Sequence, residues 1–172
     1  IVFLMFFSYP NSIIIRHNRE NLKKCTLSGI EDRPDCCFYF YPQCVKSNIP
    51  GQKSSLGDLS NYFLLDFEGP VLSKQDGAQG LILLDGTWRY AEKMVQQIPG
   101  LLDLPKRSLP SGLKTAYPRR QEDCLLPDRG LASIEALFVA YYLLGRDTTG
   151  LLDHYHWKEL FLKNNALLID FK

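Results

Sequence analysis

The chain has 172 residues, a length that suits one domain or one domain with a small appendage. Its composition, 45% hydrophobic and 23% charged, is close to that of globular proteins and argues against wholesale disorder. The formal net charge of +1 does not mark the chain as a strong nucleic-acid binder.

The N-terminal third contains short apolar runs separated by polar segments. The apolar run Ile1–Phe7 is too short to span a bilayer and lacks the layout of a signal peptide, so we expect a first core strand there. Further strands are expected at Ile13–Arg16 and Phe38–Tyr41, with a loop or irregular helix at Asn18–Asp35 between them. Residues Asn48–Ser60 are rich in Gly, Ser and Pro, which predicts a linker or surface loop.

Beyond residue 60, short apolar runs alternate with amphipathic segments. The runs Tyr62–Leu65 and Gly80–Leu84 have the continuous hydrophobicity of strands that are buried on both faces of a parallel sheet. Apolar residues recur at helical spacing in Trp88–Ile98 and in Leu131–Leu144. Asp153 is placed to cap a third helix.

This alternation predicts an α/β fold with a mainly parallel sheet and helices on both faces. We expect an N-terminal module and linker at residues 1–60 and the main α/β domain at residues 61–172. In open α/β sheets a ligand binds beyond the carboxyl ends of the strands. That rule points to the turn Asp85-Gly86-Thr87-Trp88 and to the loop after Asp66.

Two helix starts have both a functional and a structural interpretation. Asp85 follows a buried strand and is placed to meet a cationic group of a ligand, or else Asp85 or Thr87 simply caps the helix. At the later helix, Ser133 could donate to a ligand carboxylate and Glu135 could meet an ammonium group. Alternatively, both residues belong to an ordinary helix start.

Strong catalytic motifs are absent from the sequence. The five cysteines have no paired ligand spacing, and the three histidines lack metal spacing, so we expect reduced thiols and no metal. No P-loop, GxGxxG, GxSxG or HExxH motif is present. An enzyme of this sequence would therefore work by positioning two reactants rather than through a strong nucleophile.

Basic residues gather in two segments, one near the N-terminus and one at Leu104–Gln121, which carries no acid. Such clusters either contact RNA phosphates or form solvated loops. The candidate phosphate-binding residues are Arg16, Lys23, Lys24, Lys106, Arg107, Lys114, Arg119 and Arg120.

Two motifs resemble those of the aminocarboxypropyltransferases in the SPOUT superfamily. LLDGTWRYAEKM at residues 83–94 is similar to their Asp-x-Ser/Thr-Trp motif, and SIEA at residues 133–136 to their Ser-Thr-x-Glu-Ala motif. Two sister groups share these features: one modifies small-subunit ribosomal RNA during ribosome biogenesis, and the DTW-domain group modifies a tRNA uridine. The Lys24-Cys25-Thr26 tract resembles the N-terminal module of the ribosomal group and favours it. Where that group usually has Asp-Pro-Lys, this chain has Arg19-Glu20-Asn21.

The resemblance implies a SPOUT-like fold with a C-terminal trefoil knot and a dependence on S-adenosyl-L-methionine. The implied reaction transfers the 3-amino-3-carboxypropyl group to a uridine or pseudouridine base in ribosomal RNA. Alternatives are a tRNA-uridine aminocarboxypropyltransferase, a SPOUT RNA methyltransferase, and a non-catalytic RNA-binding factor of ribosome assembly. We expect a cytoplasmic monomer with RNA as its partner and no membrane association.

The resemblance also implies residue roles. Asp85 would face the amino group of the methionine moiety, Trp88 would pack on its chain and Ser133 would bind its carboxylate; these three are the catalytic candidates. The further cofactor-binding residues are Thr26 and Leu84 at the ribose, and Leu65, Leu109, Leu131 and Ala136 at the adenine. Gripping both ends of the amino-acid arm would hold its reacting carbon in line with the imino nitrogen of the base.

Overall fold

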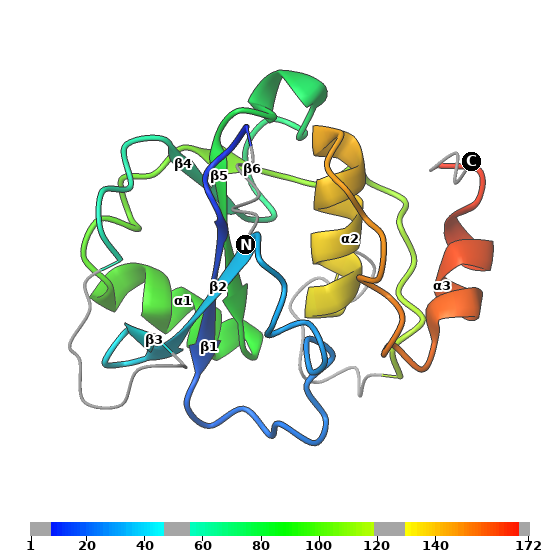
Figure 1. Cartoon of the computed structure of the whole chain (residues 1–172), viewed down its shortest axis with the longest axis horizontal. Helices are drawn as coiled ribbons and strands as arrows, with labels where there is room; N and C mark the ends of the chain where they lie inside the picture. Colours follow the sequence, from blue (N-terminus) through cyan, green and yellow to red (C-terminus); the bar gives the residue numbers. More distant parts are fainter. Residues whose placement is uncertain (1–7, 47–55, 119–129, 169–172) are drawn as a thin grey trace, which may run out of the picture.

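A mixed sheet, covered by helices on both faces, forms the centre of the computed structural model, which describes residues 8–46, 56–118 and 130–168 (Figure 1). Within these residues the sheet has the strand order β3-β2-β1-β5-β4-β6. All neighbours are parallel except β3, which is antiparallel to β2 at one edge. The strands are β1 (Ser12–His17), β2 (Cys36–Tyr41), β3 (Val45–Lys46), β4 (Tyr62–Leu65), β5 (Gly80–Asp85) and β6 (Lys106–Arg107).

Side chains alternate between the two faces of the sheet. Ile14 points to the core under α2 (Ser133–Leu144), whereas Ile13 and Ile15 point to the core under α1 (Trp88–Gln97). Figure 1 shows these two helices on opposite sides of the sheet. The predicted α/β fold with a mainly parallel sheet and helices on both faces is therefore confirmed.

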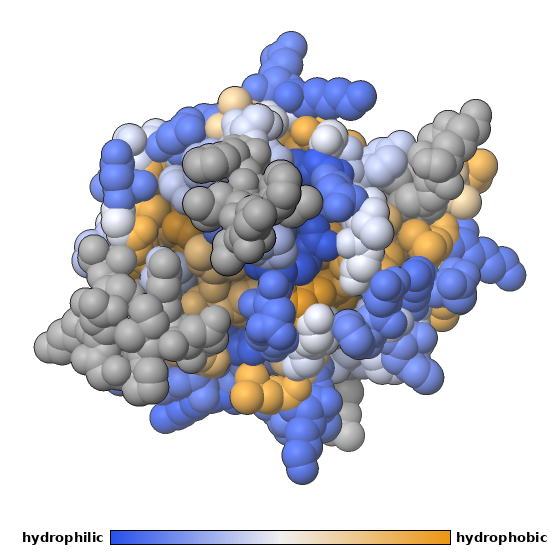
Figure 2. Space-filling view, viewed as in Figure 1, coloured by the Kyte–Doolittle hydropathy of each residue, from blue (hydrophilic) through white to orange (hydrophobic). Residues whose placement is uncertain are grey.

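Two shorter helices complete the structure. The 3-10 helix η1 (Lys74–Asp76) precedes β5, and α3 (Lys158–Asn165) packs against α2 through a ring contact between Phe138 and Phe161. Burial against both the sheet and α3 explains why α2 is apolar almost all round. The face seen in Figure 2 is mostly hydrophilic with smaller hydrophobic patches. Among the described residues, no helix has the length and hydrophobicity needed to cross a membrane.

The expected boundary near residue 60 does not separate two sheets. β1, from the predicted N-terminal module, lies between β2 and β5, so residues from both sides of the boundary share one sheet and both core clusters. The third helix begins at Lys158 rather than at Asp153, whose carboxylate pairs with Lys158 Nζ at 3.0 Å. The expected strand Ile1–Phe7 lies outside the described residues. So does segment 119–129, which precedes α2, and the trefoil knot stays a prediction.

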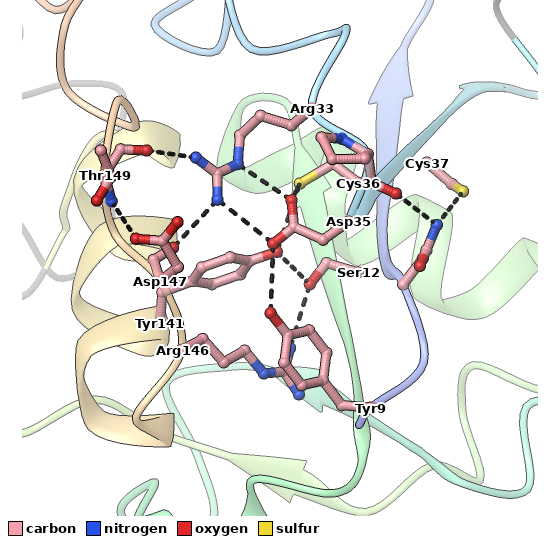
Figure 3. A network of polar contacts seen from close by, with 12 residues as sticks. Tyr9, Ser12, Arg33, Asp35, Cys36, Cys37, Tyr141, Arg146, Asp147 and Thr149 are labelled. Carbon is pink, nitrogen blue, oxygen red and sulfur yellow. Dashed lines mark hydrogen bonds and ion pairs between the residues drawn. The ribbon is translucent and has the colours of Figure 1, made fainter. Parts of the chain in front are cut away.

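A polar network holds the loop before β2 against the loop after α2 (Figure 3). Arg33 Nε donates to Asp35 at 3.1 Å, and its terminal nitrogens donate to the carbonyl oxygens of Asp147 at 3.1 Å and Thr149 at 2.6 Å. These contacts join segments more than a hundred residues apart at the amino end of the parallel strands. The opposite end of the sheet is left for a cavity.

Candidate functional site

A cavity of about 800 Å³ lies at the carboxyl ends of β4 and β5. Its wall also includes the first turns of α1 and α2 and parts of segments 24–26 and 109–113. The volume is in the range of small-molecule sites, and the position is the one that open α/β sheets use for ligands.

All nine cofactor-binding residues predicted from the sequence line this cavity. They are Thr26, Leu65, Leu84, Asp85, Trp88, Leu109, Leu131, Ser133 and Ala136. They come from five separate segments of the chain, so the fold brings together residues that the sequence spreads over more than a hundred positions.

Asp85, the last residue of β5, is buried and makes three contacts through its carboxylate. Oδ1 accepts a hydrogen bond from Ser133 Oγ at 2.8 Å. Oδ2 accepts from Arg16 Nε at 2.9 Å and from Cys25 Sγ at 3.2 Å. The turn after β5 and the start of α2 therefore converge within the cavity wall.

The capping interpretation holds for position only. Thr87 is the N-cap residue of α1, but within the described residues its side chain forms no cap hydrogen bond. Asp85 instead directs its carboxylate to Arg16, Cys25 and Ser133.

The start of α2 is held by residues from distant segments. Glu135 is fully buried, and its carboxylate accepts hydrogen bonds from Ala132 N, Ala116 N, Thr115 Oγ1 and Tyr155 Oη at 2.6–2.8 Å. Glu135 thus fixes the helix start and does not line the cavity. The hydroxyl of Thr26 accepts from Ile134 N at 3.2 Å, which adds a cap from another segment.

The apolar stripe of α1 serves two surfaces. The sequence predicts one buried stripe, but only Met94 and Ile98 are buried in the core. Trp88, Ala91 and Val95 are partly exposed and line the cavity instead. The Trp88 ring lies 5.3 Å from that of Phe67, so α1 gives the cavity an aromatic wall.

Cys25 is a donor in this site rather than a nucleophile. Burial, followed by the charge of Asp85, raises the pKa of the Cys25 thiol to about 12. The protonated thiol donates to Asp85 Oδ2. A thiolate is required for nucleophilic attack, so covalent catalysis by Cys25 is disfavoured at neutral pH.

Glu20 is a cavity residue that the sequence analysis did not select. It lines the cavity together with Asp85 and Thr87. Burial, together with the charge of Asp85, raises the pKa of Glu20. The one sequence signal for Glu20 is its position in Arg19-Glu20-Asn21, which stands where the ribosomal group usually has Asp-Pro-Lys.

The basic residues predicted to bind RNA differ in their burial and in their ion pairs. Arg16 is only 2% exposed and pairs with Asp85, so the structure corrects its prediction as a phosphate contact. Lys106 pairs with Asp66 and Glu68, both at 3.0 Å, and Arg107 pairs with Asp76 at 2.8 Å. The exposed members are Lys23, Lys24 and Lys114, and Lys24 also lines the cavity. Arg119 and Arg120 lie outside the described residues.

Fold and cavity together define a class: an α/β protein with a pocket beyond the ends of its parallel strands, lined by apolar side chains and several acids. Residues 2–161 match the model of the DTW domain, and the chain belongs to the DTW-domain family. This membership confirms the resemblance that the two motifs indicated. Of the two sister groups weighed from the motifs, the family match is to the DTW-domain group.

A solved structure supports the fold independently. The chain is similar to the structure of the SAM-dependent rRNA:acp-transferase Tsr3 from Vulcanisaeta distributa, with a TM-score of 0.65 and 19% sequence identity. The match covers 94% of this chain and 81% of that chain. A search of curated proteins gives no sequence match.

Proposed function

We propose that this protein binds S-adenosyl-L-methionine in the cavity and transfers its 3-amino-3-carboxypropyl group to a uridine-type base in RNA. The observation that carries the proposal is the contact between Asp85 and Ser133, which joins the two family motifs within one cavity wall. The DTW-domain membership and the fold shared with a SAM-dependent transferase support the same conclusion.

The cavity wall suits the parts of this cofactor. Leu65, Leu109 and Leu131 provide an apolar surface for adenine, and the hydroxyl of Thr26 lies beside it for the ribose. Trp88 offers a ring face to the sulfonium and the arm attached to it, a favourable contact for a cation. Asp85 lies at the end where an ammonium group would bind.

The cofactor supplies an activated carbon, so the protein has to select one of three carbons on the sulfonium. In the proposed reaction, the imino nitrogen of the base forms a bond to the terminal carbon of the arm and loses its proton. The bond from that carbon to sulfur breaks, and methylthioadenosine leaves with the bonding electrons. Asp85, Trp88 and Ser133 contribute by orienting the arm, which lowers the barrier by several kcal/mol.

The RNA acceptor belongs to this proposal as well. The Lys-Cys-Thr tract favours ribosomal RNA, whereas membership of the DTW-domain family favours a tRNA uridine. Lys23, Lys24 and Lys114 are exposed and are the described candidates for phosphate contacts. Cytoplasmic location and a monomeric state stay predictions.

Binding of the cofactor is tested by isothermal titration with S-adenosylmethionine. We expect Trp88→Ala to weaken binding by about tenfold to a hundredfold, because the ring that covers the arm is lost. Leu160→Ala, at an exposed position on α3, serves as the control and should bind like the wild type. Equal affinity in all three proteins would remove the site assignment.

The reaction is tested by mass spectrometry of nucleosides from both ribosomal RNA and tRNA of cells with and without the gene. A uridine-type nucleoside carrying the complete aminocarboxypropyl arm should disappear from one of the two RNA classes. Loss of a methyl group alone would instead indicate a methyltransferase. Unchanged nucleosides, with no cofactor binding, would indicate a non-catalytic RNA-binding factor.

A further inference from the structure

Asp85 is already neutralised by the protein's own cation. Its Oδ2 pairs with Arg16 Nε at 2.9 Å, and the two side chains are only 3% and 6% exposed. An ion pair at this depth leaves little net charge for a third partner. An ammonium group that binds in the cavity near Asp85 therefore needs a second negative group.

Glu20 meets this requirement. It lines the cavity, and it lies close enough to Asp85 for the charge of Asp85 to raise its pKa. Among the described residues no ion pair involves Glu20, and the nearby Arg16 pairs with Asp85 and Glu31 instead. Arg16 acts on the Glu20 charge only from a distance, so no contact ion pair among the described residues competes for this carboxylate.

The other acids of the cavity wall are less suitable. Asp66 and Glu68 share the ammonium of Lys106, with both distances at 3.0 Å. Glu92 lies one turn into α1 and is exposed to solvent, where charge interactions are weak. Glu20 differs from them because it lies near Asp85 and forms no contact ion pair among the described residues.

We propose that Glu20 binds the α-ammonium of the aminocarboxypropyl arm and so determines specificity for a cofactor that still carries this arm. This inference rests on the proposed function. It has a consequence for turnover: methylthioadenosine, which remains after transfer, has no ammonium group and loses this contact. Glu20 would therefore favour the substrate over the spent product in the same cavity.

Titration calorimetry with two ligands tests the proposal, S-adenosylmethionine and methylthioadenosine. Glu20→Gln keeps the size and shape of the side chain and removes its charge. We expect this variant to bind S-adenosylmethionine about tenfold more weakly, the effect of one lost charged hydrogen bond. Its affinity for methylthioadenosine should stay within about twofold of the wild type. The control Glu159→Gln, at an exposed position on α3 that does not line the cavity, should bind both ligands like the wild type.

The possible outcomes separate this inference from the proposed function. If Glu20→Gln binds S-adenosylmethionine as tightly as the wild type, the inference is overturned and the cofactor site stands. If both ligands weaken equally, Glu20 supports the shape of the cavity and the inference is again overturned. If the wild type binds neither ligand, the proposed function itself fails.

The pH dependence of binding gives a second readout. The ammonium requires ionised Glu20, and Glu20 has a raised pKa because of burial and the charge of Asp85, opposed by Thr87 N–H and Arg16. Affinity for S-adenosylmethionine should therefore fall as the pH is lowered through this raised pKa, because protonation removes the charge that binds the ammonium. Glu20→Gln should show a flatter profile; an unchanged profile would contradict the inference.

Discussion

Arg16 shows how strand register gives a side chain its role. Ile13–Arg16 pair with Ile82–Asp85, so Arg16 and Asp85 are direct neighbours on adjacent parallel strands. The Arg16 guanidinium also reaches Glu31 at 3.4 Å and lies 5.1 Å from the Phe38 ring centroid. Its contacts hold Asp85 in position for the cavity, and none of them can be inferred from its place in a basic segment.

The ion pair should contribute to stability. Arg16→Met removes the cation and leaves the Asp85 carboxylate buried without its partner, so we expect the free energy of unfolding to fall by about 3 kcal/mol. Urea unfolding followed by circular dichroism measures the change. Arg19→Met, at an exposed position, is the control and should stay within about 0.5 kcal/mol of the wild type. A loss for Arg16→Met no larger than that of the control would contradict the expectation.

The start of α2 shows how one helix terminus can organise a site. Ser133 faces the cavity, whereas Glu135 turns into the interior and binds segment 115–116 and Tyr155. A helix N-terminus favours a carboxylate because its backbone N–H groups lack partners within the helix. The same turn therefore presents one residue to a ligand and fixes its own position with another.

Removing the charge of Glu135 should loosen this arrangement. Glu135→Gln replaces one acceptor oxygen by an NH₂ group that faces donors, so at least one buried hydrogen bond is lost. We expect the free energy of unfolding to fall by about 2–3 kcal/mol, measured by urea denaturation. Glu159→Gln, in the exposed first turn of α3, is the matched control and should change it by less than about 0.5 kcal/mol. Equal stabilities for the two variants would show that Glu135 is not a structural anchor.

At the end of the sheet away from the cavity, buried contacts join α2 to β1 and β2. The Tyr141 hydroxyl, fully buried on α2, lies 2.9 Å from Ser12 Oγ on β1 and 3.4 Å from Cys36 Sγ on β2 (Figure 3). Arg146 adds a hydrogen bond to Ser12 and packs its guanidinium 3.9 Å from the Tyr9 ring centroid. This anchoring keeps α2 in place, so that its opposite end can meet β5 at the cavity.

Loss of the Tyr141 hydroxyl should have a modest effect, because Ser12 keeps its bond from Arg146. We expect Tyr141→Phe to lower the free energy of unfolding by about 1 kcal/mol in a thermal or urea unfolding experiment. Tyr90→Phe is the control. The ring centroids of Tyr90 and His17 are stacked 3.8 Å apart, and the Tyr90 hydroxyl forms no hydrogen bond within the described residues. If the two variants are equally stable, the hydroxyl of Tyr141 does not help to join the strands to α2.

The local sequence pattern was sufficient for the strands β1, β2, β4 and β5, for the helices α1 and α2 and for the place of the site, but it missed the two-residue edge strands β3 and β6. Apolar runs and helical spacing depend only on near neighbours, so β1, β2, β4 and β5 were located to within two residues at each end. The motif resemblance selected Asp85, Trp88 and Ser133, which lie at the end of β5 and at the starts of α1 and α2. All nine predicted cofactor residues line one cavity.

The partners of charged side chains could not be obtained in this way. Arg16 looks like a surface cation in the sequence and becomes the buried partner of Asp85, because β1 is inserted between β2 and β5. Lys106 and Glu20 likewise acquire their roles from residues far away in the chain. Electrostatic interactions depend on distance and burial, and these quantities exist only once strand order and register have placed the side chains in space.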